Sequence, residues 1–335
     1  MPEAPTWWYR SQSWQRSVLL PLSWLFQALV TLRRSAYRRG WRQVERLPVP
    51  VVVVGNITVG GSGKTPLVVR LVELLRDQGW YPGVISRGYG GRAMQWPQAV
   101  SAGSDPAQVG DEPLLLARRC RCPLWVGPDR VAAARALLAA HPQCDVLISD
   151  DGLQHYRLGR DLELVVLDGE RRLGNDACLP AGPLREPPSR LAEVDFLVVN
   201  GGVPETGAWH MDLVGEVLVN LRDPSVSCAL ATWSGQAVHA VAGIGHPQRF
   251  FDALRRHGLQ VVAHPFPDHH VFQAADLAFD DALPILMTEK DAVKCHPWAS
   301  ARCWYLPVRA RLDAELERRL TARLAALRPV SVRTV

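Results

Sequence analysis

The sequence predicts an α/β protein with a doubly wound, mostly parallel sheet, a second and smaller α/β unit, and an N-terminal amphipathic helix. Apolar strand-like runs alternate with helical patterns from residue 51 to about residue 200, which is typical of a parallel sheet with helices on both faces. Past Gly201 the runs become short and alternating. We therefore divide the 335 residues into an N-terminal helical segment (1–48), a core domain (49–210) and a smaller C-terminal domain (211–335).

The N-terminal segment carries the net positive charge of the chain. Residues 1–48 contain eight arginines, no lysine and two acids, a net charge of +6, so the rest of the chain contributes −1 to the formal net charge of +5. This distribution argues against a generally basic nucleic-acid-binding surface. It favours a local contact between the N-terminal segment and something anionic.

The same segment predicts an amphipathic helix on a membrane surface. Its apolar stretch, Val18 to Leu32, covers about 15 residues, fewer than the roughly 20 that span a bilayer. Aromatic residues along the helix and arginines at its end are typical of an interfacial anchor on anionic lipid. A helix docked on the protein's own core and a signal peptide are the alternatives. The stripe at helical spacing consists of Trp14, Val18, Leu22, Leu25, Leu29 and Leu32.

The stretch VVVVGNITVGGSGKT, residues 51–65, predicts a phosphate-binding loop, and hence a P-loop NTPase-like core. Four successive valines are typical of a buried parallel strand, and the glycines let backbone N–H groups point at an anion. Lys64 can then reach the β- and γ-phosphates, and the Thr65 hydroxyl can hold Mg²⁺. Thr58 stands where the P-loop pattern expects glycine, and a glycine-rich turn without a ligand is the alternative. The expected nucleotide-binding residues are Thr58, Val59, Gly60, Gly61, Ser62, Gly63, Lys64 and Thr65.

A second nucleotide-site signal follows the strand expected at residues 145–149. Asp150 and Asp151 come directly after it, a Walker-B-like pattern in which a carboxylate at the end of a strand binds the nucleotide's Mg²⁺ directly or through water. A solvated turn is the alternative. Their occurrence in the same chain as Lys64 and Thr65 favours a metal site.

Further core elements follow from periodicity. We expect helices at 67–78, at 114–119 and after residue 130, and strands at 83–86, 123–126, 162–167 and 196–200. The glycine-rich loop after residue 86 contains Arg87 and Tyr89, at a strand's carboxyl end where open α/β sheets bind ligands. Asp111 begins a helix, where an aspartate is commonly an N-cap.

The smaller domain is expected to contain two hairpin strands and an α/β unit. The hairpin strands are placed at 210–214 and 216–221, and the α/β unit comprises a strand at 238–243, a helix at 247–257 and a strand at 260–263. The loop 265–270 places Asp268 beside His269 and His270, and a histidine next to an acid is a candidate for catalytic proton transfer. A further strand at 285–288 ends in Glu289-Lys290-Asp291, to which we assign no function.

The motifs together resemble the tetraacyldisaccharide 4'-kinase family, the lipid A 4'-kinases of Gram-negative bacteria. The resemblance covers nearly the whole chain, and Thr58 agrees with it, because this family's loop reads TVGGxGKT. It rests on GNITVGGSGKTP, SRGYGG, VGDEP, GPDR, SDDGLQH, LPAGPLRE, GIGHPQRFF, FPDHH and TEKDAVK, which occur in this order.

The resemblance implies roles for individual residues. Lys64 and Thr65 match the residues for phosphate and Mg²⁺, and Asp150 and Asp151 match the metal-binding acids. Asp111 matches the acid that takes the proton from the acceptor hydroxyl, and His269 the histidine paired with it. Residues around the phosphates or the substrate are matched by Arg87, Tyr89, Arg130, Gln154 and Arg185.

The resemblance also implies the reaction and its setting. ATP with Mg²⁺ is expected to phosphorylate the 4'-hydroxyl of tetraacyldisaccharide 1-phosphate, giving lipid IVA. This acylated disaccharide lipid stays in the bilayer, so we expect the enzyme at the cytoplasmic face of the bacterial inner membrane, peripheral or N-terminally anchored on anionic lipid. No nucleic acid and no obligate protein partner are expected. The alternative function is a membrane-associated P-loop NTPase switch or assembly factor that has no phosphoryl acceptor.

Overall fold

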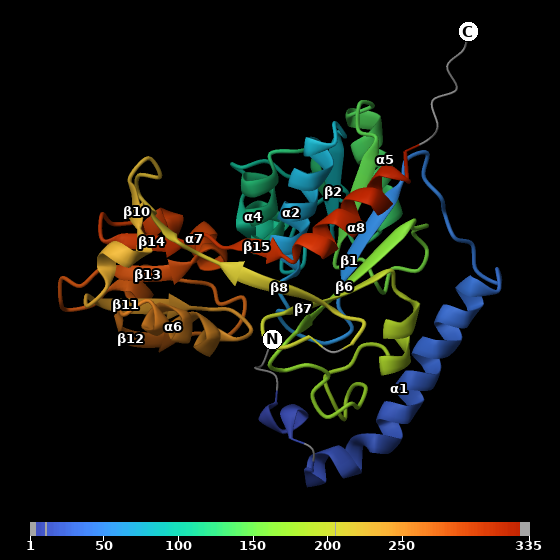
Figure 1. The fold of residues 1–335 in the computed structure, drawn as a ribbon, viewed down its shortest axis with the longest axis horizontal. Coiled ribbons are helices and arrows are strands. Elements are labelled where there is room, and N and C mark those ends of the chain that lie inside the picture. Colours follow the sequence, from blue (N-terminus) through green and yellow to red (C-terminus); the bar gives the residue numbers. More distant parts are fainter. Residues whose placement is uncertain (1–4, 11, 205, 329–335) are drawn as a thin grey trace.

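The structure, a computed structural model, describes residues 5–10, 12–204 and 206–328 and contains two sheets with a long N-terminal helix beside the larger one (Figure 1). The larger sheet has nine strands and the smaller has six. This architecture confirms the predicted fold class, a P-loop NTPase-like parallel sheet with a second α/β unit and an N-terminal amphipathic helix.

The larger sheet is parallel except at its two edges. Its strand order is β15-β8-β7-β6-β1-β5-β2-β4-β3, and only the edge pairs β15–β8 and β3–β4 are antiparallel. The strands are β1 (Val51–Gly55), β2 (Pro82–Ser86), β3 (Gln98–Ala99), β4 (Leu124–Val126), β5 (Val146–Asp150), β6 (Leu162–Asp168), β7 (Phe196–Asn200), β8 (Trp209–Val214) and β15 (Arg309–Leu312).

The central strand β1 is buried on both faces, because helices cover both sides of the sheet. Its successive valines alternate between two cores, with Val52 and Val54 in one and Val51 and Val53 in the other. The first core is completed by α2 (Lys64–Asp77), α4 (Asp111–Cys120) and α8 (Ala314–Ala325), and the second by α5 (Arg130–Ala140). The short helix α3 (Pro106–Val109) precedes α4.

The smaller sheet mixes parallel and antiparallel pairs in the order β10-β9-β14-β13-β11-β12. Its strands are β9 (Val217–Asn220), β10 (Ser227–Ala229), β11 (Ala237–Ala242), β12 (Gln260–Pro265), β13 (Ile285–Thr288) and β14 (Cys303–Leu306). The helices of this unit are α6 (Pro247–Arg256) and α7 (Glu289–Cys295). Single 3-10 turns occur at Thr6–Tyr9, Pro188–Glu193, Ala274–Leu277, Leu230–Trp233 and His296–Trp298.

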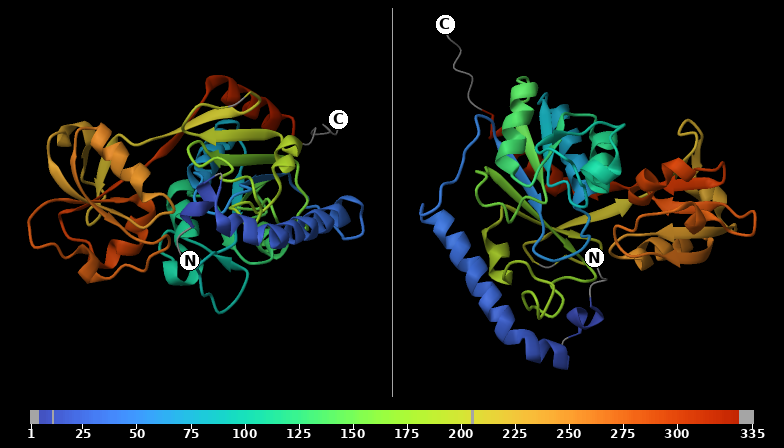
Figure 2. Two further views of the ribbon diagram at one scale, coloured as in Figure 1. Left: turned by 90° about the horizontal axis from the view of Figure 1, so that it is seen from below. Right: turned by 180° about the vertical axis from the view of Figure 1, so that it is seen from behind.

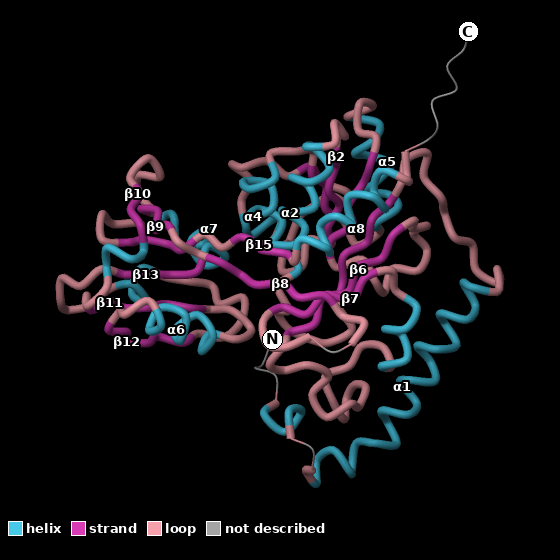
Figure 3. Tube along the Cα trace, viewed as in Figure 1, coloured by secondary structure: helices cyan, strands magenta, loops and turns pink. Residues whose placement is uncertain are grey.

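The predicted hairpin after residue 209 is wrong. Strand β8 pairs with β7 and β15 in the larger sheet, whereas β9 pairs with β10 and β14 in the smaller sheet. Figure 3 shows β8 leading from the larger group of strands toward the smaller one. The two runs are separated only by Gly215 and Glu216, a length that also suits a two-residue hairpin loop. The chain uses this short connection to cross between sheets.

The chain also crosses back. Strand β15 and helix α8 lie on the larger sheet, although the sequence assigned all of residues 211–335 to the smaller domain. Residues 329–335 lie outside the described part of the chain. The domain boundaries themselves stay a prediction, but the larger unit draws its C-terminal strand and helix from beyond residue 308.

The N-terminal helix α1 (Trp14–Arg38) runs along one side of the larger unit (Figure 2). Its N-cap is Ser13, whose side chain accepts a hydrogen bond from the backbone N–H of Arg16. Ser23 is its one buried residue and donates to the carbonyl of Cys178 at 2.7 Å.

The predicted apolar stripe of α1 faces away from the protein. All six of its side chains are between 55% and 72% exposed. The alternative of a helix docked on the protein's own core therefore holds only for the opposite face, where Phe26 packs against the core and Ser23 is buried. Within the residues described, no helix is both long and apolar enough to cross a membrane.

Candidate active site

The phosphate-binding loop lies between β1 and α2, as predicted. Gly60 and Gly63 have φ values of 104° and 94°, in the left-handed region that favours glycine. Gly63 is the N-cap of α2, and the first N–H groups of that helix have no acceptor within it. These groups are therefore available to an anion, and the partial positive charge of the helix N-terminus favours one.

Threonine is accommodated at position 58, where the P-loop pattern has glycine, because a second segment holds the loop around it. Thr58 is 8% exposed and forms a β-bridge with Leu184, and the N–H of Val59 donates to the carbonyl of Pro183 at 2.9 Å. The N–H of Arg185 donates to the carbonyl of Ile57. The segment LPAGPLRE thus braces the loop in an extended conformation.

Lys64 and Arg185 both meet Asp151. Lys64 Nζ lies 3.4 Å from Asp151 Oδ1, and Arg185 donates to Asp151 Oδ2 at 3.1 Å. Burial alone would raise the pKa of Asp151, but these two positive charges hold it well below its usual range. Asp151 is therefore ionised and engaged by cations of the protein.

Asp150 has different surroundings. Its carboxylate is 1% exposed, and the Ser86 hydroxyl donates to Oδ2 at 3.0 Å. Its Oδ1 is buried without a hydrogen-bond partner among the described residues. Burial, together with the negative charge of Glu112 and Asp151, raises the pKa of Asp150 to about 7. An orphaned, buried carboxylate oxygen beside a phosphate-binding loop fits a hard divalent cation.

Arg130 and Gln154, expected near the phosphates or the substrate, both support the loops. Arg130 is 2% exposed and donates to the carbonyls of Gly127, Asp150 and Asp151. Gln154 donates to the carbonyl of Asn56 at 3.1 Å. Their groups hold backbone at the ends of β1 and β5.

Asp111 and His269 lie together, although they are far apart in the sequence. His269 Nδ1 donates to Asp111 Oδ2 at 3.0 Å, and the His269 ring contacts Tyr89 with its centroid 5.2 Å away. Burial alone would raise the pKa of Asp111. The hydrogen bond from His269 and the charge of Lys290 outweigh burial and hold that pKa well below its usual range.

The Asp111–His269 pair and the P-loop are joined through Gly245. A Cβ atom at Gly245 would lie 3.1 Å from the backbone N of Gly61 and 3.4 Å from Asp268 Oδ2. This glycine of the smaller unit therefore packs directly between the P-loop and the residue preceding His269. Predicted site residues from both units thus lie close together, and the exposed Arg87 is near enough to lower the pKa of Arg130 by its charge.

The family described as Tetraacyldisaccharide-1-P 4'-kinase matches residues 15–325 of the chain. The chain belongs to this family. Its relatives include tetraacyldisaccharide 4'-kinases of Alkalilimnicola ehrlichii, 55% identical over 99% of this chain and 100% of the relative, and of Methylobacillus flagellatus, 53% identical over 96% and 95%. A crystal structure of LpxK from Aquifex aeolicus in complex with ATP is similar, with a TM-score of 0.78 and 30% identity over 93% of this chain and 99% of that one.

Membership in the tetraacyldisaccharide 4'-kinase family confirms the resemblance drawn from the motifs and makes the chain an ATP-dependent kinase. The roles of single residues remain predictions.

The site of this kinase also contains two lysines that the sequence reasoning missed. Lys290 Nζ lies 2.9 Å from Glu112 Oε1, 3.2 Å from Asp268 Oδ1 and 4.0 Å from Asp111 Oδ2. Lys294 Nζ lies 2.9 Å from Asp291 and 3.9 Å from Asp111. The only signal was the run TEKDAVK, in which both lysines fall on one face of a short helix.

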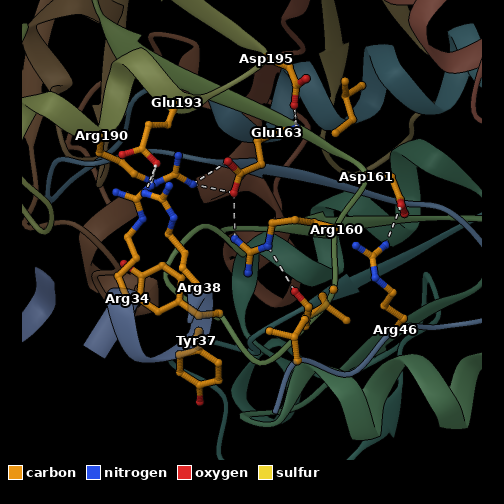
Figure 4. A pocket seen from close by; sticks show the side chains of 15 residues that line it. Arg34, Tyr37, Arg38, Arg46, Arg160, Asp161, Glu163, Arg190, Glu193 and Asp195 are labelled. Atoms are coloured by element: carbon orange, nitrogen blue, oxygen red, sulfur yellow. Dashed lines mark hydrogen bonds and ion pairs between the residues drawn. The ribbon is translucent and has the colours of Figure 1, made fainter. Parts of the chain in front are cut away.

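A cavity of about 330 Å³ lies away from these residues, between the arginine-rich end of α1 and the amino ends of the strands (Figure 4). Arg34 and Arg38 of α1 both pair there with Glu193, and Arg190 pairs with Glu163. Each of these three arginines thus has an acidic partner, with Arg34 and Arg38 sharing Glu193. The cavity contains none of the predicted site residues.

Proposed function

We propose that the chain transfers the γ-phosphate of ATP to the 4'-hydroxyl of tetraacyldisaccharide 1-phosphate and so forms lipid IVA in lipid A biosynthesis. Family membership supports this acceptor. The observation that carries the proposal is the Asp111–His269 pair beside the P-loop. A proton acceptor there suits an alcohol substrate, whereas a switch NTPase has no acceptor hydroxyl to deprotonate.

In this reaction the 4'-oxygen forms a bond to the γ-phosphorus while the bond from that phosphorus to the bridging β–γ oxygen breaks, and ADP leaves. The hydroxyl proton passes to the Asp111 carboxylate, and the N–H of His269 holds that carboxylate in place through its hydrogen bond. A carboxylate with a lowered pKa is a weak base, but phosphoryl transfer depends mainly on positioning and charge neutralisation. The proton therefore needs to move only late in the step.

The nucleotide is proposed to bind with its phosphates on the N–H groups of residues 59–65 and on Lys64. Mg²⁺ would be held by Thr65 and Asp150, since Asp150 has the free buried oxygen and Asp151 already meets Lys64 and Arg185. The cation would neutralise charge on the β- and γ-phosphates. Asp151 then serves to hold Lys64 in place.

The other predicted residues divide into two groups. Arg130 and Gln154 are proposed to position the loops, because their polar groups are committed to backbone carbonyls. Arg87 and Tyr89 lie on the exposed loop after β2 and are proposed to meet the substrate, with Tyr89 against the His269 ring.

The exposed stripe of α1 is proposed to bind the cytoplasmic face of the inner membrane, where the lipid substrate lies. Six apolar side chains, each more than half exposed, form one face of a long helix whose last turns carry arginines. Apolar burial and attraction to anionic lipid act together in such a helix. The smaller unit is proposed to complete the site from the opposite side, so that catalysis needs the two units together.

An acceptor assay tests the function. Wild type is expected to transfer labelled γ-phosphate to the disaccharide, and Asp111→Ala to lose at least about 10²-fold in kcat, since general bases contribute about 10²–10⁴-fold. Binding of an ATP analogue should remain. Release of free phosphate by wild type, with no labelled lipid, would instead identify the NTPase switch.

A further inference from the structure

Helix α6 of the smaller unit is linked to the P-loop through strand β7, by contacts that the proposed chemistry does not use. Arg249 lies near the start of this helix, and its Nη2 donates to Asn200 Oδ1 at 2.9 Å and to the Asn200 carbonyl at 3.3 Å. Its Nη1 lies 3.4 Å from Asp168 Oδ2. The guanidinium thus bridges the carboxyl ends of β6 and β7.

Asn200 connects Arg249 to the P-loop. The side chain is 2% exposed, and its Nδ2 donates to the Ser62 carbonyl at 3.0 Å. Because Oδ1 accepts from Arg249 while Nδ2 donates to Ser62, the two contacts allow only one orientation of the amide. Arg249 therefore fixes the direction in which Asn200 presents its donor.

Gly63, the P-loop residue beside Asn200, leaves the Asn200 side chain little room to move. Gly63 is left-handed, and a Cβ atom there would lie 2.4 Å from Asn200 Nδ2. Gly63 is also the N-cap of α2, so its peptide orientation determines where the first N–H groups of the helix point. A displacement of Asn200 would therefore shift the N–H groups that bind phosphate.

We propose that Arg249 and Asn200 are positioning residues that link the smaller unit to the P-loop and hold the loop in the conformation that binds the nucleotide's phosphates. This rests on the proposed use of ATP, and it adds that α6 of the smaller unit influences nucleotide affinity without touching the nucleotide. Arg249 acts through Asn200, and Asp168 holds the guanidinium in register. The side chain of Arg249 is 24% exposed and polar at its end, so its replacement removes hydrogen bonds and an ion pair to Asn200 and Asp168 and no apolar core side chain.

The test is a double-mutant cycle read by binding of a fluorescent ATP analogue to the full chain without acceptor. Arg249→Ala and Asn200→Ala are each expected to raise Kd by about tenfold, because small misplacements of preorganised groups are costly. The double variant should bind no more than about tenfold worse than wild type, since both changes break the same chain of contacts from Arg249 through Asn200 to the P-loop. Arg249→Lys keeps one cation and should recover part of the affinity.

Arg256→Ala is the matched control, because Arg256 is an exposed arginine on the same helix, and it should leave Kd unchanged. Thermal unfolding of each variant with no nucleotide separates misfolding from repositioning. If Asn200→Ala proves unstable, Arg249→Ala compared with Arg249→Lys decides.

Two results would contradict the proposed link from Arg249 through Asn200 to the P-loop. Additive effects in the double variant would mean that Arg249 and Asn200 act independently. An unchanged Kd in Arg249→Ala would mean that α6 does not influence the loop. The acceptor assay is separate from this measurement, so wild type that binds ATP but does not label the disaccharide would refute the proposed function alone.

Discussion

Lys290 shows how closely single charges are balanced around Asp111. Its ammonium is surrounded by the carboxylates of Asp111, Glu112 and Asp268 and is only 16% exposed. Burial alone would lower the pKa of Lys290, but the charges of Glu112 and Asp111 hold it well above its usual range. The lysine is therefore charged at neutral pH, and it neutralises acids contributed by both units.

We expect Lys290→Met to lower the free energy of unfolding by about 3 kcal/mol at pH 7, because it removes the cation shared by the buried Asp111 and the partly exposed Glu112 and Asp268. The folded-state pKa of Lys290 is raised, so its contribution is fully present at pH 7 and is lost only at strongly alkaline pH. The folded-state pKa of Asp111 is depressed, so the stability it contributes is present above about pH 4 and is lost as the pH falls further. Urea unfolding at pH 7 measures the destabilisation, and urea unfolding at pH 3 measures how much of the Asp111 contribution is lost in acid.

The difference between Lys290→Met and wild type should shrink at pH 3. Lys294→Met provides a comparison in which the lost partner is mainly Asp291. An equal destabilisation by Lys290→Met at both pH values would show that packing of the lysine stem, and not its charge, stabilises the site.

Among the elements, helix α1 packs on the protein with one face and exposes an apolar stripe on the other. One face contacts the larger unit through Ser23 and Phe26, and the other exposes the apolar stripe. The helix also lies close to the segment that braces the P-loop. Ser23 of α1 donates to the Cys178 carbonyl, and Trp8, in the 3-10 turn that precedes α1, donates to the Pro180 carbonyl.

For this reason, substitution in the stripe is a cleaner test of membrane binding than deletion of residues 1–40. We expect the double variant Leu25→Gln, Leu29→Gln to bind anionic vesicles at least roughly tenfold more weakly, since each buried leucine contributes about 2 kcal/mol. ATP-analogue binding and thermal stability should not change, because these side chains are 58% and 57% exposed. Vesicle sedimentation gives the partition constant.

Ser23→Ala is the control on the opposite face of α1. It removes a buried hydrogen bond at a cost of about 1 kcal/mol in stability and should leave vesicle binding intact. Undiminished sedimentation of the double leucine variant would mean that the stripe does not enter the membrane. Loss of ATP binding in that variant would instead favour a structural role for the helix.

The elements predicted from the sequence are those whose pattern is local. The P-loop strand, its helix and the strand before Asp150 follow from apolar runs, glycines and periodicity, and the structure contains all three. Whether β8 pairs with β9 depends on partners more than 90 residues away, such as β15, and a two-residue connection is compatible with either outcome. Likewise, Lys290 approaches Asp111 only because α7 packs on α4, which no local pattern encodes.

At the scale of the whole molecule, the chain passes from the larger unit to the smaller one after β8 and returns before β15. The returning segment completes the larger core, since Leu316, Leu320 and Leu324 of α8 are fully buried beside α2. Strand β15 also covers the edge of β8. The larger unit therefore depends on the last part of the chain, and the two units do not separate at a single cut.

This dependence leads to a prediction about the C-terminus. We expect Leu320→Ala to lower the free energy of unfolding by about 2–5 kcal/mol, as for other buried leucines. A chain that ends at Val308 loses three such leucines together with β15, which is comparable to the whole stability of a typical domain, so it should not yield folded protein that binds ATP. A chain that ends at Arg328 keeps β15 and all of α8 and is the matched control for shortening the chain. Thermal unfolding and ATP-analogue binding of the three variants provide the test, and a folded, ATP-binding chain 1–308 would show that the larger unit is complete without its C-terminal return.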